Sequence, residues 1–264
     1  MVVPIQLPFI DRFGVAYMRK FILAAFLAAS WSLSAGAAEI KVLSSNGMRE
    51  AMMDLAPHFE HSTGHKLSIR YDTAAFLQRD IERGESFDVT VITTTQFDAL
   101  AKIGKFDLAT RTRVALSGVG IAVRKGAPKP DIGSVEAFKR TLLAAKSIAY
   151  ATVGASGVYF MAVCERLGIA AEVKAKGKTL PGGSLGEFVA RGEAELAIQQ
   201  ISELFPVEGI ELVGPLPAEV QLITPYTAAV GASSKEAATG KAFIAFLTTP
   251  AAHTVLKAKG LDPG

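Results

Sequence analysis

The chain has 264 residues, half of them hydrophobic, and a formal net charge of +3 at pH 7. This length and this apolar content allow one large domain or two small lobes with an ample core. A net charge so close to zero excludes an electrostatic case for a nucleic-acid or membrane-surface partner, so any specificity for anions must come from a local site.

The first 38 residues have the features of a secretory signal peptide. An Arg-Lys pair precedes the apolar run FILAAFLAASWSL, and small residues of the A-x-A type follow it. The run is short for a membrane span, and no second one follows. We therefore expect residues 1–38 to be removed by cleavage after Ala37 or Ala38, with Met18 as an alternative start, and the mature protein to work in the periplasm.

Strand and helix patterns alternate through the rest of the chain. Residues 40–57 begin with the alternation of a strand and end with helical spacing, and residues 67–71 and 77–84 repeat this order. FDVTVI at 87–92 is a β-branched run of the kind found in parallel sheets. Three threonines follow it, and they predict the start of a helix that ends at Gly104.

The second half continues in the same way. Further strands are expected at 118–126, 147–150, 194–200 and 221–230, and further helices at 134–145, 158–167, 185–190, 242–246 and around 255. Ser134 is the expected cap of its helix. This repeated alternation predicts an α/β fold with a parallel sheet.

Two junctions between a strand and a helix share an unusual composition. The segments 44–47 and 152–157 both place small polar residues and a glycine directly before a helix. A helix N-terminus attracts anions through its unpaired N–H groups, hydroxyls add donors, and glycine lets a ligand approach the backbone. Such serines are also common helix caps, so a purely structural role is the alternative. Two such junctions in two halves of one chain favour an anion site shared by two lobes.

Motifs of other functions are absent or incomplete. The sequence has no G-x-x-x-x-G-K-[ST] phosphate loop, no complete dinucleotide fingerprint and no G-x-S-x-G elbow. His58 and His61 have helical i,i+3 spacing, but no Asp, Glu or Cys completes a recognisable site, so no metal is expected. Cys164 is the only cysteine, which excludes an intramolecular disulfide, and its apolar surroundings predict a buried, unreactive thiol.

Three segments resemble the periplasmic molybdate-binding proteins of ABC importers: residues 39–57, YDTAAFLQRDIERGESFDVTVITTTQFDALAKIGKFD and GASGVYFMAVCERLGI. The similarity covers essentially the whole chain after the signal segment. It implies a two-lobed type II periplasmic binding protein fold, an α/β fold with parallel-rich mixed sheets and a ligand cleft between the lobes. Lobe 1 would comprise 39–118 and 222–264, and lobe 2 would comprise 119–221. The resemblance also implies a monomer without a cofactor that hands a small anion to an ABC permease.

The resemblance further predicts the residues of the cleft. The expected ligand-binding residues are Ser45, Asn46, Thr73, Ser156, Gly157, Tyr159 and Gln200. The chain departs from the family's pattern at two places: the segment 73–75 replaces a serine-rich one, and Gln200 replaces a tyrosine that contacts the oxyanion. The loss of a hydroxyl and a tyrosine speaks against molybdate, whereas the amides of Asn46, Gln199 and Gln200 suit a larger ligand with several carboxylates and hydroxyls.

The aconitate isomerases are built on the same scaffold, and the chain is also similar to them. They interconvert cis- and trans-aconitate by a proton shift across an allylic carbon, which needs a positioned base and a clamp on the carboxylates. Glu203, Tyr159 and Asp72 are the candidate bases. Two hypotheses follow: a periplasmic protein that binds a small oxyanion or organic polycarboxylate for an ABC importer, or an isomerase of a small tricarboxylate. A titratable side chain that points at the ligand would distinguish the enzyme from the binder.

Overall fold

The computed structural model describes residues 37–264. The predicted signal peptide, which ends at Ala37 or Ala38, lies almost entirely outside the described residues. Within the described part, none of the helices is long and apolar enough to cross a membrane. From Ala38 to Gly264 the chain forms one unit.

Strands and helices alternate in the first part of this unit, as the sequence predicts. The elements are β1 (Glu39–Ser45), the 3-10 helix η1 (Asn46–Met48), α2 (Arg49–Thr63), β2 (Lys66–Asp72), α3 (Ala74–Glu82), β3 (Val89–Thr93), α4 (Thr94–Lys102), η2 (Leu108–Thr110) and β4 (Thr112–Arg124). Glycines in the left-handed region follow α3 and α4, at Gly84 and Gly104, and end these helices as expected, and Gly64 follows α2 in the same way.

The second part begins with α5, whose first turn is capped by the Ser134 side chain, an acceptor for the Ala137 N–H at 3.2 Å. The elements are α5 (Val135–Ala144), β5 (Ile148–Ala151), α6 (Ala155–Arg166), α7 (Ala170–Ala175), β6 (Gly177–Leu180), α8 (Gly186–Ala190), β7 (Leu196–Gln200), α9 (Ile201–Leu204), β8 (Ile210–Pro215) and η3 (Ala218–Val220). The chain then returns through β9 (Ile223–Val230), α10 (Ala237–Leu247), α11 (Pro250–Ala258) and β10 (Asp262–Pro263).

Besides the three 3-10 helices, five of these elements are missing from the sequence-based expectation: α7, β6, α9, β8 and β10. All five are six residues long or shorter, and the residues of β6 and β8 are half-buried or exposed, so no buried apolar face marks these strands in the sequence. These strands form because their backbones pair with a neighbour, β6 with β5 and β8 with β4. Backbone pairing of this kind leaves little trace in a hydrophobic pattern.

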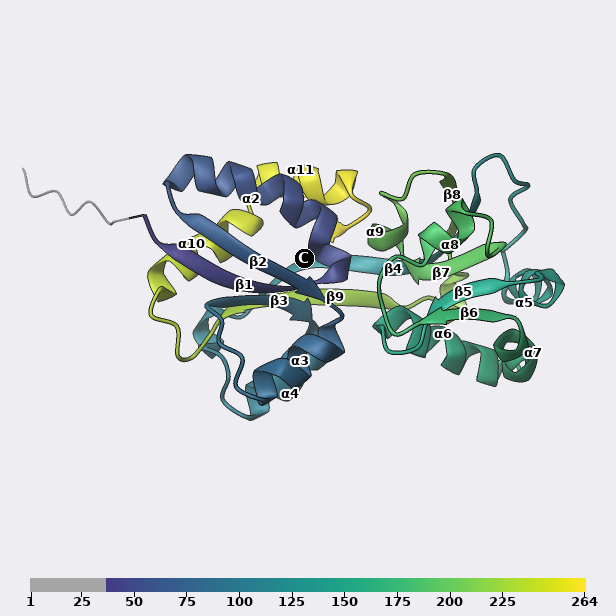
Figure 1. Ribbon diagram of the computed structural model, residues 1–264, viewed down its shortest axis with the longest axis horizontal. Coiled ribbons are helices and arrows are strands. Elements are labelled where there is room, and N and C mark those ends of the chain that lie inside the picture. The colour runs from purple at the N-terminus through teal and green to yellow at the C-terminus, as the bar shows by residue number, and fades with distance from the viewer. Residues whose placement is uncertain (1–36) are drawn as a thin grey trace, which may run out of the picture. The chain divides into compact units, whose positions relative to one another are not determined.

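The strands follow the order β2-β1-β3-β9-β4-β7-β5-β6, with β8 and β10 also paired to β4. Parallel pairs join β1 to β2 and β3, and β5 to β6 and β7, whereas β9 and β4 run antiparallel to their neighbours. Strand β4 is shared between two groups, because Thr112–Gly118 pairs with β9 and Val119–Ala122 pairs with β7. Figure 1 shows β4 and β9 running from one lobe towards the other.

The hydrophobic cores follow the same division. One core cluster runs from Val119 to Val220 and packs α5, α6 and α8 against the strands of lobe 2. In lobe 1 the sheet has a core on each face: Val42 packs under α2, α10 and α11, while Leu43 points to the α3 and α4 side. The lobe boundaries at 118/119 and 221/222 stay a prediction.

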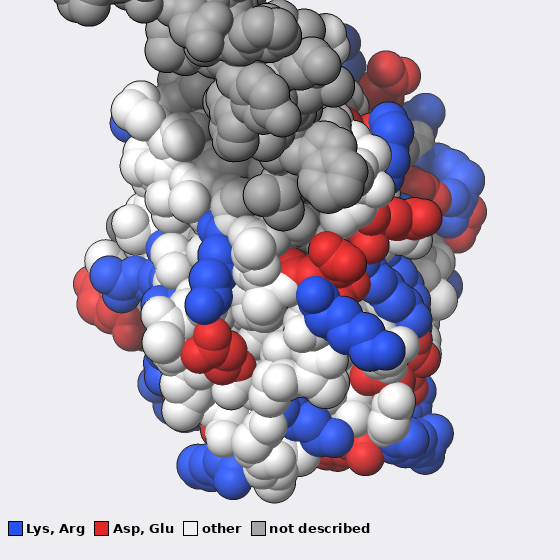
Figure 2. Space-filling view, turned by 90° about the vertical axis from the view of Figure 1, so that its left-hand side faces the viewer, with Lys and Arg blue, Asp and Glu red and all other residues white. Residues whose placement is uncertain are grey.

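Cys164 belongs to the lobe 2 core and is fully buried, as predicted. Burial raises the pKa of its thiol to about 12, so the reactive thiolate is suppressed. On the face seen in Figure 2, basic and acidic side chains are interspersed. This pattern is in keeping with the small net charge of the chain.

Candidate functional site

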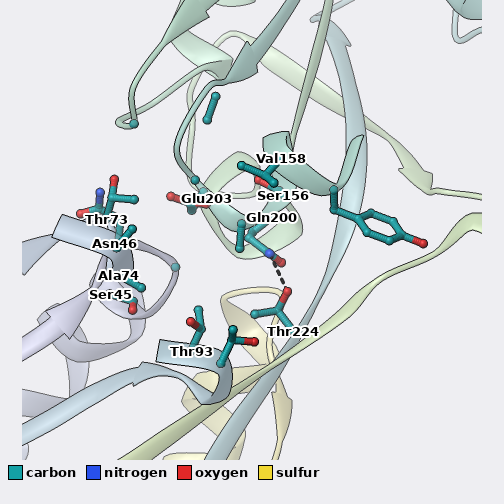
Figure 3. A pocket seen from close by; sticks show the side chains of 18 of the residues that line it. Ser45, Asn46, Thr73, Ala74, Thr93, Ser156, Val158, Gln200, Glu203 and Thr224 are labelled. Atoms are coloured by element: carbon teal, nitrogen blue, oxygen red, sulfur yellow. Dashed lines mark hydrogen bonds between the residues drawn. The ribbon is translucent and has the colours of Figure 1, made fainter. Parts of the chain in front are cut away.

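A cavity of about 450 Å³ lies where the N-termini of α3, α4 and α6 meet the ends of β1, β7 and β9. Figure 3 shows Ser45, Asn46, Thr73 and Thr93 on one side of it and Ser156 and Glu203 on the other. The cavity therefore takes side chains from both lobes. The first N–H groups of each helix have no partner within the helix, so three partial positive charges converge on this space.

The lobe 1 wall presents hydroxyls that do not cap the helices behind them. Ser45, Thr73 and Thr93 each precede a helix, yet none of them accepts a backbone N–H of its first turn, and the Thr93 hydroxyl bonds to the Gln96 side chain instead. The Ser45 side chain is 3% exposed, and its hydroxyl has no hydrogen-bond partner among the described residues. A buried hydroxyl without a partner is costly unless a ligand or water completes it. The alternative that these residues are ordinary caps is wrong for this wall.

A glycine is required at position 47 because the side chain of Tyr226 occupies the space next to it. A Cβ on Gly47 would lie 2.0 Å from the hydroxyl oxygen of Tyr226, a residue that is 2% exposed and that lines the cavity from β9. Only glycine fits against a side chain so close. The missing side chain of Gly47 therefore leaves room for Tyr226 of β9, and it also leaves the backbone open to a ligand.

The lobe 2 wall begins with the first turn of α6. Ser156 lines the cavity, but Gly157 does not. The Gly157 N–H donates to the Gly154 carbonyl at 3.1 Å, and a Cβ on Gly157 would lie 1.9 Å from the carbonyl oxygen of Ala151. This glycine lets α6 pack directly on β5, and its expected part in holding the ligand stays a prediction. The sequence cannot separate these two uses of glycine, because both need a missing side chain.

Tyr159 and Gln200 line the cavity with polar groups that are already engaged. The Tyr159 hydroxyl donates to the Gln221 carbonyl at 3.3 Å. The Gln200 side chain is 3% exposed and is bonded to the Thr224 hydroxyl at 2.8 Å, a contact drawn in Figure 3. With its amide oxygen towards the Thr224 hydroxyl, its amide nitrogen donates to the carbonyls of Ser117 at 3.1 Å and Gly118 at 3.3 Å. Gln200 therefore ties β7 to both strands that connect the lobes.

Glu203, at the start of α9, is the lining residue whose side chain can carry a full charge near neutral pH. Burial raises the pKa of its carboxyl to about 7, while the nearby Gln199 amide and the positive charge of Arg49 lower it only in part. The carboxyl can thus be present in both protonation states at neutral pH. A group of this kind in a cavity wall suits proton transfer.

The other two candidate bases have different surroundings. The Asp72 carboxylate accepts the Thr73 N–H at 2.7 Å and lies 3.3 Å from the Arg70 guanidinium, and Asp72 is outside the cavity wall. The Tyr159 hydroxyl faces a backbone carbonyl, as described above. Of the three candidates, Glu203 alone combines access to the cavity with a pKa near 7.

Several lining residues are absent from the sequence-based expectation. Gly182 and Gly183, in the loop after β6, come close to lobe 1, since a Cβ on Gly182 would lie 2.1 Å from the Thr73 hydroxyl oxygen. The Pro-Gly-Gly-Ser run predicts a turn there, and a turn alone does not indicate a site. Thr224 and Tyr226 reach the cavity because β9 pairs between β3 and β4. No local pattern reveals that pairing.

The lining offers few ligands for a metal. Among the described residues, no group of three or more His, Cys, Asp or Glu side chains is arranged to hold a metal ion. The donors of the cavity are hydroxyls, amides and backbone N–H groups, which suit an anion held by neutral groups. The cavity also has an apolar edge, because Val158 and Ile223 line it and are 55% and 52% exposed.

Comparison with known proteins agrees with this architecture. A family model described as bacterial extracellular solute-binding protein matches residues 40–262. An aconitate isomerase from a Pseudomonas species is 36% identical over 249 residues, which cover 91% of this chain and 95% of that protein. The molybdate-binding protein of Azotobacter vinelandii is 26% identical, with 86% and 91% covered.

A solved structure of the periplasmic molybdate-binding protein from Azotobacter vinelandii has a TM-score of 0.72 at 19% identity, and the match covers 84% of this chain and 98% of that chain. At this level of identity the likeness speaks for the fold alone. It shows the α/β fold of the periplasmic binding proteins, with two lobes and a cleft between them. The chain belongs to the family of bacterial extracellular solute-binding proteins.

Proposed function

We propose that this protein is an isomerase of a small unsaturated tricarboxylate, with aconitate as its substrate and Glu203 as its base. The observation that carries the proposal is the Glu203 carboxyl, which lies in the wall of the cavity with a pKa of about 7. A pure binder has no need of a group that changes its protonation state near neutral pH. The relative named aconitate isomerase, 36% identical along nearly the whole chain, supports the same reaction.

The reaction is a shift of one proton within an allylic system. The Glu203 carboxylate takes a proton from the methylene carbon next to the double bond, and the electron pair left behind delocalises over the three carbons and the attached carboxylate. The double bond then forms between the other pair of carbons as the protonated Glu203 returns a proton to the far end. One carboxyl suffices for both steps, and its pKa near the working pH favours each of them.

The polar donors of the lining explain how a polyanion binds although the described lining residues include no Lys or Arg. The N-termini of α3, α4 and α6 and the hydroxyls of Ser45, Thr73 and Ser156 supply donors and partial positive charge from both lobes. These donors are fixed by the elements that carry them, so they also stabilise the charge that develops on the substrate during proton removal. The Ser45 hydroxyl, buried without a partner, would gain one from the bound substrate.

The test is proton NMR of trans-aconitate in deuterated buffer with a trace of the purified protein. We expect cis-aconitate to accumulate and deuterium to enter the methylene position, because a trace of a binder cannot shift a bulk equilibrium. Glu203→Gln should abolish both changes. Glu219→Gln is the matched control, since Glu219 is exposed on η3 and lines no part of the cavity. Normal turnover by Glu203→Gln would overturn the role of the carboxyl.

A second candidate is a solute-binding protein that delivers a small anion to an ABC importer. The family and the molybdate-binding relative favour it. This candidate predicts tight binding without turnover, measured by a thermal-shift panel from molybdate to citrate. In either case the double variant Ser45→Ala with Ser156→Ala should lose the stabilisation by ligand, and a stabilisation that persists would argue against this site.

A further inference from the structure

A second cavity, of about 610 Å³, adjoins the first. The two share four residues, Asn46, Gly183, Gln199 and Glu203. Glu203 is the shared residue with an ionisable side chain, so its carboxyl can be reached from two directions. The second cavity has no part in the proposed binding of substrate, which raises the question of its use.

The wall between the cavities is held by hydrogen bonds on both sides of the carboxyl. Gln199 is 2% exposed, accepts the Leu185 N–H at 3.0 Å and donates to the Gly183 carbonyl at 2.7 Å. On the lobe 1 side, the Asn46 side-chain oxygen accepts from the Arg49 guanidinium at 3.2 Å. Because these residues are fixed, Glu203 occupies a defined place in the partition.

The second cavity suits water better than substrate. Its remaining charged residues are Arg49, Glu50, Glu187 and Glu208, so carboxylates outnumber the one cation among its described lining residues. A substrate with three carboxylates would be repelled there. Ser184 also lines this cavity, and its hydroxyl is buried without a partner among the described residues. Polar walls with an unsatisfied donor bind water.

We propose that the second cavity is the route by which Glu203 exchanges its proton with solvent while substrate fills the first cavity. The inference rests on the proposed isomerase function. In each turnover Glu203 gains a proton from the substrate carbon. A water molecule in the second cavity exchanges it for a solvent hydrogen, so the carboxyl in D₂O becomes deuterated and HOD leaves. The hydrogen that returns to the far carbon therefore comes from solvent.

The experiment narrows the second cavity and follows the origin of the transferred hydrogen. Ser184→Met and, as an independent variant, Val207→Met place a longer apolar side chain in this cavity and leave the lining of the first unchanged. Ser62→Met is the control, because Ser62 is exposed at the end of α2 and lines neither cavity. Mass spectrometry at low conversion in D₂O measures the fraction of product that retains the hydrogen of the substrate.

The wild-type protein and Ser62→Met should give product that carries one solvent deuterium. In at least one of the two cavity variants the fraction with retained substrate hydrogen should rise severalfold while isomerisation continues. The same deuterium content in both folded variants, or retained hydrogen in the wild type, would overturn this inference and leave the isomerase proposal intact. Absence of isomerisation in the wild type would instead overturn the proposed function itself.

Discussion

Ser45 illustrates at the scale of one residue how a site differs from a structural junction. It stands before a helix, has the side chain of a good cap, and caps nothing. Its hydroxyl is buried and without a partner among the described residues, whereas the neighbouring Ser44 hydroxyl reaches the Ser45 carbonyl at 3.5 Å. In the free protein the Ser45 hydroxyl therefore carries the energetic cost of a buried, unpaired polar group, whereas the neighbouring Ser44 hydroxyl has a partner.

We predict that Ser45→Ala leaves the free energy of unfolding of the free protein unchanged or raises it by up to about 1 kcal/mol, because an unsatisfied hydroxyl is removed. The same change should weaken the binding of aconitate by roughly 10- to 100-fold, the worth of a hydrogen bond to a charged group. Urea denaturation and calorimetric titration measure the two effects. Ser44→Ala is the matched control, and an equal loss of affinity in both variants would contradict this role of Ser45.

Glu203 connects the site to the pH dependence of stability. Its pKa rises from an ordinary value of 4.5 to about 7 in the folded protein, so the folded state binds the proton more tightly than the unfolded state. Ionisation of the folded carboxyl is therefore unfavourable. Stability attributable to this group is fully present below pH 4.5 and is lost as the pH rises through about 7.

Glu203→Gln should remove this dependence. At pH 8 we expect the variant to be more stable than the wild type by up to about 3 kcal/mol, and at pH 4.5 the two should be nearly equal. Urea denaturation at both pH values measures the difference. A gain of the same size at pH 4.5 and pH 8 would show that it comes from packing and not from ionisation.

At the scale of elements, the contact between α6 and β5 depends on one glycine. A Cβ on Gly157 would approach the carbonyl oxygen, carbonyl carbon and amide nitrogen of Ala151 to within 3 Å, and these are backbone atoms that cannot turn aside. The same helix brings Ser156 and Tyr159 to the cavity. The close packing therefore sets the position of the lobe 2 wall.

We predict that Gly157→Ala destabilises the protein by roughly 2 kcal/mol or more, although alanine is the better helix former by about 1 kcal/mol. Chemical denaturation measures the change. The control is Ala245→Gly at an exposed position of α10, which measures the effect of helix propensity alone. A gain in stability from Gly157→Ala would mean that α6 can move away from β5.

For the whole molecule, the mixed charges of the surface and the lack of Lys and Arg in the described cavity lining both bear on how an anion is captured. The net charge is small, the face in Figure 2 mixes both signs, and the cavity lining contains no described Lys or Arg. Attraction of a polyanion thus depends on short-range donors within the cavity. Salt screens charges over about 10 Å at 0.1 M, so it acts weakly on such contacts.

We predict that the KM for aconitate changes by less than about threefold between roughly 20 and 200 mM NaCl. Initial rates at several salt concentrations measure it, with sucrose at matched osmolality as the control. A steep rise of KM with salt would point to long-range capture by surface lysines and arginines, and away from a site built from hydroxyls and helix N-termini.

Much of this architecture can be predicted from local sequence. The alternation of strand and helix, the cap at Ser134, the buried Cys164 and the two polar junctions are confirmed because each depends on neighbours within a few residues. Six of the seven expected site residues line the cavity, and Gly157 is the exception. Their role in holding a ligand stays a prediction. Strands β6, β8 and β10 were missed because each of them forms by pairing with another strand, and α7 and α9 were missed because they have only six and four residues.

Composition, periodicity and capping are local properties, and from them the sequence predicts a signal segment, an α/β chain and two small polar junctions. Which groups meet depends on the tertiary structure. Pairing of β9 between β3 and β4 brings Tyr226 against Gly47, and the packing around α9 places the Glu203 carboxyl beside Gln199, where desolvation raises its pKa. A carboxyl has an ordinary pKa until burial removes its water, and burial is a property of the assembled molecule.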